Sequence, residues 1–494
     1  MSLKKQTLWS LAPLLVTTGI NLVSVPLFYR YLGAEMYALW FYVLTFTGAF
    51  GFMDLGFGVA VGRYVGVALG RNDFQAVREY WGTGNAIAIP LLAAMGLVFA
   101  VVGVTLGPRW FNVDPASVSL LRWSFVAGGA GLFLSYYAQF WFILSQAHLD
   151  FKFLGIVRVA INLLQVLPSI LLAALTRNPL VLIVWGTLIG AIQLSVFIWH
   201  ARKNYCLRFD LAHAARHRAR EMAAFTAKTF ASLIIGSFTS TADRLVLGKL
   251  APPFEFTNYA ISSNAGQRII GLSATVMGPV FHNTNRAVGR GSGESVAGVY
   301  NEIFDFTFPW YALISVWTLL WHPVLLRLWL GQHLGASIAP IFAPIIVGCC
   351  LTAVGNISTA QLGSLNRVGI GLIFNMLTGV LLVTGVLAGW HWYGIVGVAW
   401  GFLLSRVIGV IQDLYLIRLV NAGGWLAAST WRQLALQLTI GLLFSISMLF
   451  WPRQSLWQLV SALLHGSTVS ALLLKHPMRK LFFQKDTVTA SRLL

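Results

Sequence analysis

The feature that most constrains this chain is a series of long, continuous apolar segments, such as residues 83–106 and 368–389. A helix of about 20 apolar residues is long enough to cross the hydrocarbon core of a bilayer. Charged residues are only 10% of the 494 residues and the mean hydropathy is +0.74. A soluble domain carries roughly 25% charged residues. The sequence therefore predicts a polytopic membrane protein.

The fold class follows from how a backbone can cross lipid. Its polar groups must be hydrogen bonded internally, so only helices and closed barrels span a bilayer. Continuous rather than alternating apolar runs predict an all-α protein with about fourteen transmembrane helices. The first run follows Lys4 and Lys5 and shows no small-residue cleavage site, so we expect an uncleaved span. The expected spans are residues 8–29, 37–58, 83–106, 119–144, 153–175, 179–199, 226–249, 256–281, 304–322, 337–361, 368–389, 393–417, 431–451 and 454–474.

The distribution of basic residues predicts the orientation. Most of the 34 lysines and arginines fall on one side of these spans, which by the positive-inside rule is the cytoplasmic side. We therefore expect both termini in the cytoplasm. The net charge of +19 is then explained by topology and by contact with anionic membrane lipids, not by a nucleic-acid partner. The basic connection at 201–225 is expected to lie as a helix on the inner membrane surface.

No motif for catalysis or for a cofactor is found. The sequence lacks a phosphate-binding G-x-x-x-x-G-K-[ST] loop, an H-E-x-x-H helix and a G-x-S-x-G turn. The cysteines are Cys206, Cys349 and Cys350, an odd set without metal-ligand spacing, so we expect small core or loop residues. The sequence predicts a protein that is not an enzyme and has no cofactor.

One histidine pair has a spacing that can hold a metal. His213 and His217 lie four residues apart, with Glu221 one turn further on. The three arginines interspersed among them would repel a cation, and no metal site is predicted.

A weak internal repeat organises the chain. Residues 27–38 resemble residues 243–260, with an arginine, a Leu-Gly pair, a glutamate and a Tyr-Ala pair in the same order, and Asn162 aligns with Asn375 in a second match. The copies lie about six spans apart, which predicts two six-helix lobes related by a pseudo-two-fold axis along the membrane normal, plus two C-terminal helices. The expected parts are residues 1–200 (first lobe), 201–225 (basic linker), 226–420 (second lobe), 421–474 (helices 13 and 14) and 475–494 (basic cytoplasmic tail).

Several expected spans carry a polar stripe. Polar groups are costly against lipid, so these faces should turn toward each other or toward water. For single serines and threonines, hydrogen bonding between helices explains the pattern equally well. For stripes that include an arginine we favour a hydrated cavity, whose expected polar lining is Asn162, Gln165, Asn264, Asn356 and Asn375.

The arginines within the spans differ in depth. Arg268 and Arg406 are near mid-span, where a charge costs about 2.5–3.5 kcal/mol even on the mildest scale. They therefore need an anionic partner, either a carboxylate or a phosphate, which a guanidinium binds in a bidentate manner. The carboxylates that can balance this charge or bind a coupling cation are Asp54, Asp243 and Asp413. Ion pairs within each lobe remain an equal alternative.

Four segments carry a resemblance to a known family: VPLFYRYLGAEMYALWFYVL, FMDLGFGVAVGRYVGVALGRND, TSTADRLVLGKLAPPFEFTNYA and GNISTAQLGSLNRVGI. They resemble the polysaccharide-biosynthesis flippases, the Wzx-type O-antigen and exopolysaccharide exporters. These belong to the multidrug/oligosaccharidyl-lipid/polysaccharide transporter superfamily. The resemblance covers most of the first twelve expected spans.

The resemblance implies a multi-pass protein of the bacterial inner membrane that serves lipopolysaccharide or exopolysaccharide synthesis. Its substrate would be an undecaprenyl-pyrophosphate-linked oligosaccharide, moved to the outer leaflet by alternating access, with cation antiport as a driving force. Polysaccharide polymerase and chain-length machinery would be partners. Carried onto this sequence, the cavity arginines would be Arg268, Arg406, Arg158 and Arg244, with Arg30 and Arg63 at the mouths.

Two alternatives remain open. A cation-coupled multidrug exporter of the related branch would favour acidic cavity residues, and the mid-span arginines argue against it. An integral-membrane glycan polymerase or ligase would usually carry a large outer loop, whereas the longest loop here, 201–225, is predicted to be inside.

Overall fold

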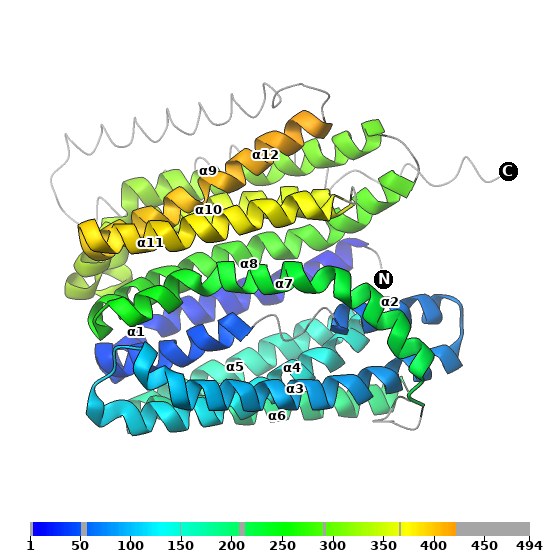
Figure 1. The fold of residues 1–494 in the computed structure, drawn as a ribbon, viewed down its shortest axis with the longest axis horizontal. Coiled ribbons are helices and arrows are strands. Elements are labelled where there is room, and N and C mark those ends of the chain that lie inside the picture. The colour runs from blue at the N-terminus through cyan, green and yellow to red at the C-terminus, as the bar shows by residue number, and fades with distance from the viewer. Residues whose placement is uncertain are drawn as a thin grey trace. The chain divides into compact units, whose positions relative to one another are not determined.

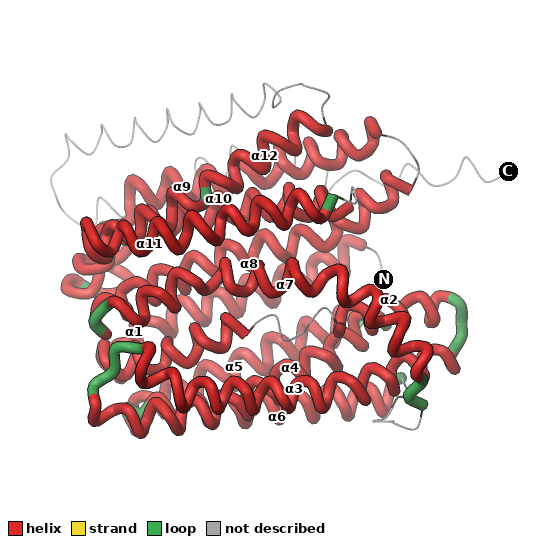
Figure 2. Tube along the Cα trace, viewed as in Figure 1, coloured by secondary structure: helices red, strands yellow, loops and turns green. Residues whose placement is uncertain are grey.

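The computed structural model describes residues 3–50, 57–148, 150–205, 207, 213–289, 293–364 and 367–420. Within these ranges the chain is almost entirely helical and contains no strand (Figure 2). Seven of the described helical segments are long and apolar enough to cross a membrane. The all-α prediction is confirmed.

The chain forms two compact units, residues 1–261 and residues 262 onward. The first unit holds the helices drawn in blue, cyan and the first greens of Figure 1. They are α1 (Leu3–Ala49), α2 (Phe57–Gly70), α3 (Phe74–Trp110), the short 3-10 turn η2 (Pro115–Ser117), α4 (Val118–Ala147), α5 (Phe151–Thr176), α6 (Pro179–Asn204), α7 (Arg216–Leu250) and the start of α8 (Pro253–Gly289).

Short polar residues begin several of these helices. The side chain of Asp73 accepts a hydrogen bond from the backbone of Ala76 at the start of α3, and Asp150 caps α5 in the same way. Asn178 caps α6 and is followed by Pro179 at the first helical position. Such caps satisfy backbone N–H groups that the first helical turn leaves open. They fix where the apolar segments begin.

Two segments of the first unit differ from the expectation. The glycine-rich segment with Arg63 forms its own helix, α2. Residues 216–225 do not form a separate surface helix but are the start of α7, continuous with the expected span at 226–249. No proline or glycine occurs between Arg216 and Ile235 to end the helix, which explains the continuity.

The second unit contains the rest of α8, then α9 (Gly293–Leu330), α10 (Gln332–Ser364), α11 (Val368–Ser405) and α12 (Val407–Val420). Helix α11 folds back at Tyr393 and Gly394, where Gly394 has a φ of 58°. This left-handed conformation favours glycine, and it divides α11 into two arms.

The two arms of α11 pack backbone against backbone. A Cβ atom built at Gly385 would lie 2.9 Å from the carbonyl oxygen of Gly401, and one built at Gly389 would lie 2.9 Å from the nitrogen of Val398. Gly397 faces Gly389 at the same crossing. Small residues allow such an approach between membrane helices, where dispersion contacts take the place of a hydrophobic driving force.

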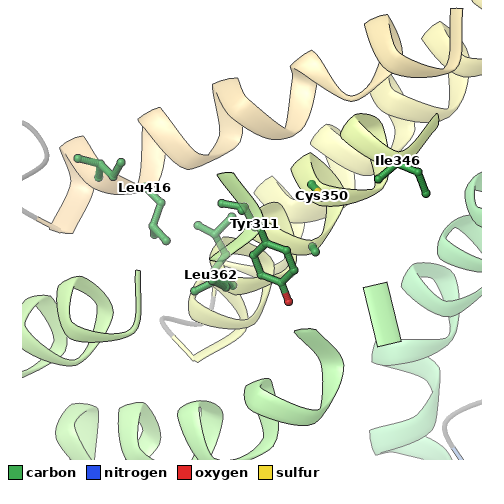
Figure 3. Close-up of a cluster of buried hydrophobic side chains, with 9 residues drawn as sticks. Tyr311, Ile346, Cys350, Leu362 and Leu416 are labelled. Carbon is green, nitrogen blue, oxygen red and sulfur yellow. The ribbon is translucent and has the colours of Figure 1, made fainter. Parts of the chain in front are cut away.

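The core of the second unit joins α9, α10 and α12 (Figure 3). Tyr311, Ile346, Cys350, Leu362 and Leu416 are among its buried members. Cys349 and Cys350 are buried and form no disulfide, as expected for core residues. The core fixes α12 against α10, which positions the polar residues described below.

The first twelve expected spans coincide with described helices, except that residues 51–56 of the second span lie outside the described residues. The expected spans 431–451 and 454–474 also lie outside them, so the count of fourteen stays a prediction. The proposed lobes at 1–200 and 226–420, with the linker between them and the parts at 421–474 and 475–494, stay a prediction about the internal repeat. The two compact units divide after Ile261, within α8.

Candidate functional site

Arg158 on α5 is exposed, and its position around the helix shows what it faces. Successive residues of a helix are about 100° apart, so Arg158, Asn162, Gln165 and Ser169 share one face. The apolar exposed residues of α5 lie on nearly the opposite face: Ile156, Leu164, Leu167, Leu171 and Leu175. An apolar exposed stripe is the face expected against lipid. Arg158 is therefore directed away from that face.

The rest of this polar stripe is closed by helix packing. Ser169 is 3% exposed and donates to the backbone oxygen of Gln165 at 2.6 Å. The Gln165 amide packs against α6 at Gly186. Asn162 Oδ1 is buried and accepts no hydrogen bond among the described residues. The polar face of α5 thus carries the exposed Arg158 and, one turn further on, Asn162, whose buried amide oxygen accepts no hydrogen bond among the described residues.

The first unit also contains the pair Asp243 and Arg244 on α7. Asp243 is 2% exposed, and its Oδ2 accepts a hydrogen bond from the Tyr259 hydroxyl at 2.7 Å. Arg244 Nε lies 3.9 Å from Asp243 Oδ1, and Arg244 Nη2 donates to the Ser240 backbone oxygen at 2.7 Å. Asp243 and Arg244 thus lie close enough for an ion pair.

In the second unit, Arg406 is the single residue between α11 and α12, where the helix tightens: its backbone angles stay helical (φ −78°, ψ −10°) and its N–H donates to the Leu403 oxygen at 3.0 Å. Its guanidinium carbon is 4.4 Å from the centre of the Phe402 ring, and the residue is 8% exposed. Its aliphatic stem packs beside Gly348 of α10, where a Cβ atom would lie 3.5 Å from Cγ. A cation over an aromatic face is attracted by the ring quadrupole. Arg406 is therefore held in place inside the unit.

A buried polar network follows Arg406 on α12. Gln412 Nε2 donates to the Thr359 hydroxyl at 2.8 Å, and the Asp413 carboxylate is hydrogen bonded with Ser358. Asp413 is 6% exposed, and its Oδ1 accepts no hydrogen bond among the described residues. Such a carboxylate oxygen is an open position for a proton or a cation.

A second part of the network connects α8, α9 and α10. Asn356 Nδ2 donates to the Ser273 hydroxyl at 3.3 Å, and Ser273 is hydrogen bonded with Tyr311. Our sequence analysis identified Asn356 and Asp413 but missed Ser273, Ser358 and Gln412. Their signal was weak because a single serine or amide in a membrane helix usually only bonds a neighbouring helix.

The other expected site residues are less defined. Asn264 and Arg268 lie on α8 in the second unit, half-buried, and Asn375 is half-buried on α11. Arg30 is exposed on α1, three residues before the kink at Gly33. The side chain of Arg63 and the whole of Asp54 lie outside the described residues.

The structure thus divides these residues between the two units. Arg158, Asn162, Gln165, Asp243 and Arg244 lie in the first unit. Arg406, Asp413, Asn356, Asn264 and Arg268 lie in the second.

The start of α7 forms an ionic cluster with α3 that sequence reasoning missed. Arg218 Nε donates to Glu79 at 3.1 Å, and Arg218 Nη1 donates to the Tyr80 hydroxyl at 2.8 Å. The Tyr80 hydroxyl in turn donates to Glu221 at 2.8 Å. Glu221, which the spacing offered as a metal ligand, is thus engaged with Tyr80 and also pairs with Arg218. This cluster fastens the start of α7 to α3.

A further cluster joins the ends of α4, α5 and α6. Asp150 Oδ2 lies 2.9 Å from His200 Nε2 and accepts from the Tyr205 hydroxyl at 3.2 Å. The Tyr205 ring stacks on the His148 ring, with ring centres 3.9 Å apart. Burial lowers the pKa of His148 and raises the pKa of Tyr205 to about 12. His200 and Tyr205 are 50 and 55 positions from Asp150, so no local pattern in the sequence pairs them with it.

Comparison with known families gives one match that covers more than half of the chain. A family model described as polysaccharide biosynthesis protein matches residues 3–284. No curated protein sequence matches the chain significantly.

Solved structures with the same fold include multidrug transporters and a lipid II flippase. An inward-facing multidrug resistance MATE family transporter of the MOP superfamily matches with a TM-score of 0.66 and 15% identity, covering 84% of this chain and 98% of that chain. The lipid II flippase MurJ in an inward closed conformation matches with a TM-score of 0.69 and 11% identity, covering 94% and 98%. A MOP superfamily transporter from Pyrococcus furiosus, described as having a binding pocket of reversed polarity, matches with a TM-score of 0.63 and 14% identity, covering 85% and 96%. At these identities the likeness shows the fold.

Proposed function

Because this chain belongs to the polysaccharide biosynthesis protein family, we propose that it flips an undecaprenyl-pyrophosphate-linked oligosaccharide. The substrate moves from the cytoplasmic to the outer leaflet of the bacterial inner membrane by alternating access. The likeness to the lipid II flippase MurJ supports a fold that can carry a lipid-linked glycan. The glycan is the repeat unit of an O-antigen or exopolysaccharide.

The observation that carries this proposal is the depth of Arg406, which is only 8% exposed and lies in the middle of the expected span 393–417. An arginine far from the ends of a membrane span is expensive and marks a substrate or ion path. We assign Arg406 and Arg268, both in the second unit, to the pyrophosphate. Arg158, directed away from the apolar stripe of α5, binds it on entry.

Asp413 is proposed as the coupling group. It lies two helical turns beyond Arg406 and holds one buried oxygen without a hydrogen bond among the described residues. A proton or cation on this carboxylate would change the charge close to the pyrophosphate site. Asp243 is instead proposed to balance Arg244, 3.9 Å away.

The test compares surface polysaccharide in cells that carry Arg406→Ala, Arg268→Ala or the control Arg418→Ala. Arg418 is an exposed arginine on the same helix as the coupling group. A charge-assisted hydrogen bond contributes about 1.5–3 kcal/mol, so each site variant should lower export roughly 10- to 150-fold, and the control should not. Arg406→Lys should restore little, because lysine cannot form the bidentate contact.

Lipid-linked oligosaccharide should accumulate in the two site variants, which separates a block in flipping from a block in synthesis. Full export with both variants present at normal membrane levels would refute the site. Loss of polysaccharide without accumulation of the lipid-linked precursor would refute flipping as the step.

One alternative has an observation in its favour. The MATE transporters share the fold, and a buried carboxylate such as Asp413 suits a cation-coupled multidrug exporter. Purified protein in vesicles that effluxes organic cations down an imposed ion gradient would support this function. Arg406 and Arg268 argue against it, since cationic drugs would be repelled.

The surroundings of the protein form part of the proposal. With both termini in the cytoplasm, the basic side contacts anionic inner-leaflet lipids, and polysaccharide polymerase and chain-length machinery take the product on the outer side. Labelling of single cysteines with a membrane-impermeant thiol reagent at Arg109→Cys and Arg202→Cys tests the orientation. Only the first position should react in intact cells.

A further inference from the structure

We propose that residues 110–112 and the turn between α7 and α8 form an outer latch that opens during each transport cycle. The outer latch consists of Trp110–Asn112 on one side and Leu245–Ala251 on the other. All of these residues belong to the first unit. The inference rests on the proposed function, because a latch has a role only in a protein that alternates between two states.

Hydrogen bonds to main-chain oxygens hold the latch closed. The Asn112 backbone N–H donates to the Gly248 oxygen at 3.1 Å, and the Asn112 amide donates to the Ala251 oxygen at 3.5 Å. The Trp110 indole N–H donates to the Leu245 oxygen at 3.0 Å. The segment after α3 thus binds the C-terminal end of α7 along its last turn.

The ring of Phe111 fits into a space that a glycine leaves. Phe111 is 3% exposed and stacks on Tyr42, with ring centres 4.4 Å apart. A Cβ atom at Gly248 would lie 2.8 Å from the Phe111 ring, closer than real Cβ contacts allow. Phe256 at the start of α8 packs on the other side of Tyr42, with ring centres also 4.4 Å apart. A side chain at position 248 would therefore prevent the latch from closing.

A buried hydrogen bond outside the latch holds the α7–α8 hairpin as one piece. Asp243 on α7 and Tyr259 on α8 share a buried hydrogen bond of 2.7 Å, which fastens the two helices together. Helix α8 continues without a break from Pro253 through Ile261, the last residue of the first unit, to Gly289 in the second (Figure 1). A continuous helix transmits displacement along its axis. A displacement along α8 would therefore reach Pro253, next to the latch.

The contacts at the exposed rim of the latch are of a kind that can open. Trp110 is 43% exposed, and the Lys249 ammonium lies 4.7 Å from the centre of its ring. Water can replace hydrogen bonds at such an exposed rim, whereas the Asp243–Tyr259 bond is buried. The hairpin should therefore detach as a unit from residues 110–112 while it stays intact.

The experiment introduces Trp110→Cys and Lys249→Cys into a protein in which Cys206, Cys349 and Cys350 are alanine. A short, reducible bis-methanethiosulfonate cross-linker then joins the two exposed positions. Flipping of lipid-linked oligosaccharide is measured in vesicles before treatment, after treatment and after addition of reductant. The single variants Trp110→Cys and Lys249→Cys, treated identically, control for modification alone.

The expected result is loss of at least about tenfold in flipping on cross-linking, with recovery on reduction, because closed-state gating then limits turnover. The latch proposal is overturned if the cross-linked protein flips as fast as the untreated one. Failure of the pair to cross-link, checked by mass spectrometry, overturns it as well, since the two sides would not be adjacent. If the cysteine-free parent moves no lipid-linked oligosaccharide in these vesicles but does efflux organic cations, the proposed function fails. The latch is then tested by the same cross-link on cation efflux.

Discussion

The contact between the two arms of α11 gives a sharp test of the fold. We consider Gly397→Ala, which adds one methyl group at the crossing. The new Cβ atom would lie 2.6 Å from the carbonyl carbon of Gly389 and 2.8 Å from its Cα. Real Cβ atoms essentially never approach heavy atoms more closely than 3.0 Å. Because both neighbours are backbone atoms, no side chain can turn away, and the two arms must separate.

The magnitude follows from two opposing effects. Inserting a methyl group into a tightly packed contact costs about 1–3 kcal/mol. Replacing glycine by alanine inside a helix returns about 0.5–1 kcal/mol through the lower entropy of the unfolded chain. The net expectation is a loss of about 1–2 kcal/mol in the free energy of unfolding, dominated by the lost contact. That corresponds to a decrease in the thermal midpoint of roughly 2–8 °C.

The assay is thermal unfolding of the purified protein in detergent, followed by tryptophan fluorescence. Gly369→Ala is the matched control on the same helix, because a Cβ atom there meets nothing within 4 Å. It should leave the midpoint unchanged or raise it. The double variant Gly389→Ala/Gly397→Ala should cost less than the sum of the two single variants, because the first methyl group already separates the arms. If Gly397→Ala is as stable as the control, the close approach of the arms is incorrect.

Three further predictions follow from individual contacts. Arg218→Ala should lower the thermal midpoint in detergent, because Glu79 loses a partly buried charged partner worth about 1–2 kcal/mol; Arg218→Lys should recover only part of this loss. Tyr259→Phe should destabilise the protein by about 1–3 kcal/mol in the same assay, since it leaves the buried Asp243 Oδ2 without its donor, and an unchanged midpoint would contradict this. The pKa of His148 is lowered by burial, so the folded state resists its protonation; stability should therefore fall as the pH drops through about 6.5, the value in the unfolded chain. His148→Gln should reduce the difference between midpoints measured at high and low pH.

The helices were largely predictable because a bilayer leaves few choices. A long apolar run must be helical wherever it crosses lipid, and this constraint acts locally on the sequence. The kink at Gly33 was also accessible, because it falls between the expected spans 8–29 and 37–58. The tightened turn at Arg406 was not, since residues 393–417 appear as one apolar run and neither proline nor glycine marks the position. Such a local change depends on packing with neighbouring helices, and that information is tertiary.

The candidate site was predictable by residue type and not by partner. Its position near the middle of an expected span singled out Arg406. Helical spacing placed Arg158 on a polar face opposite the leucines of α5. The repeat drew attention to Tyr259 as part of a Tyr-Ala pair but gave no indication that its hydroxyl donates to Asp243. Ser358, the partner of Asp413, lies on another helix at a distance in sequence that no periodicity connects. Partners across helices depend on packing, which a single sequence does not contain.

The two buried aspartates show how similar residues in the two units can have different tasks. Asp243 has a hydroxyl donor at 2.7 Å and a guanidinium at 3.9 Å, so its charge is balanced in place. Asp413 is also buried and, like Asp243, has one oxygen that accepts no hydrogen bond among the described residues, but no ion pair such as that with Arg244 is found for it there. A buried carboxylate is tolerated only if it is paired, protonated or bound to a cation. Asp243 has an arginine within 4 Å and is suited to the first condition, whereas Asp413 is suited to the second or third. For this reason we place charge balance on α7 and exchange of a proton or cation on α12, two helical turns beyond Arg406.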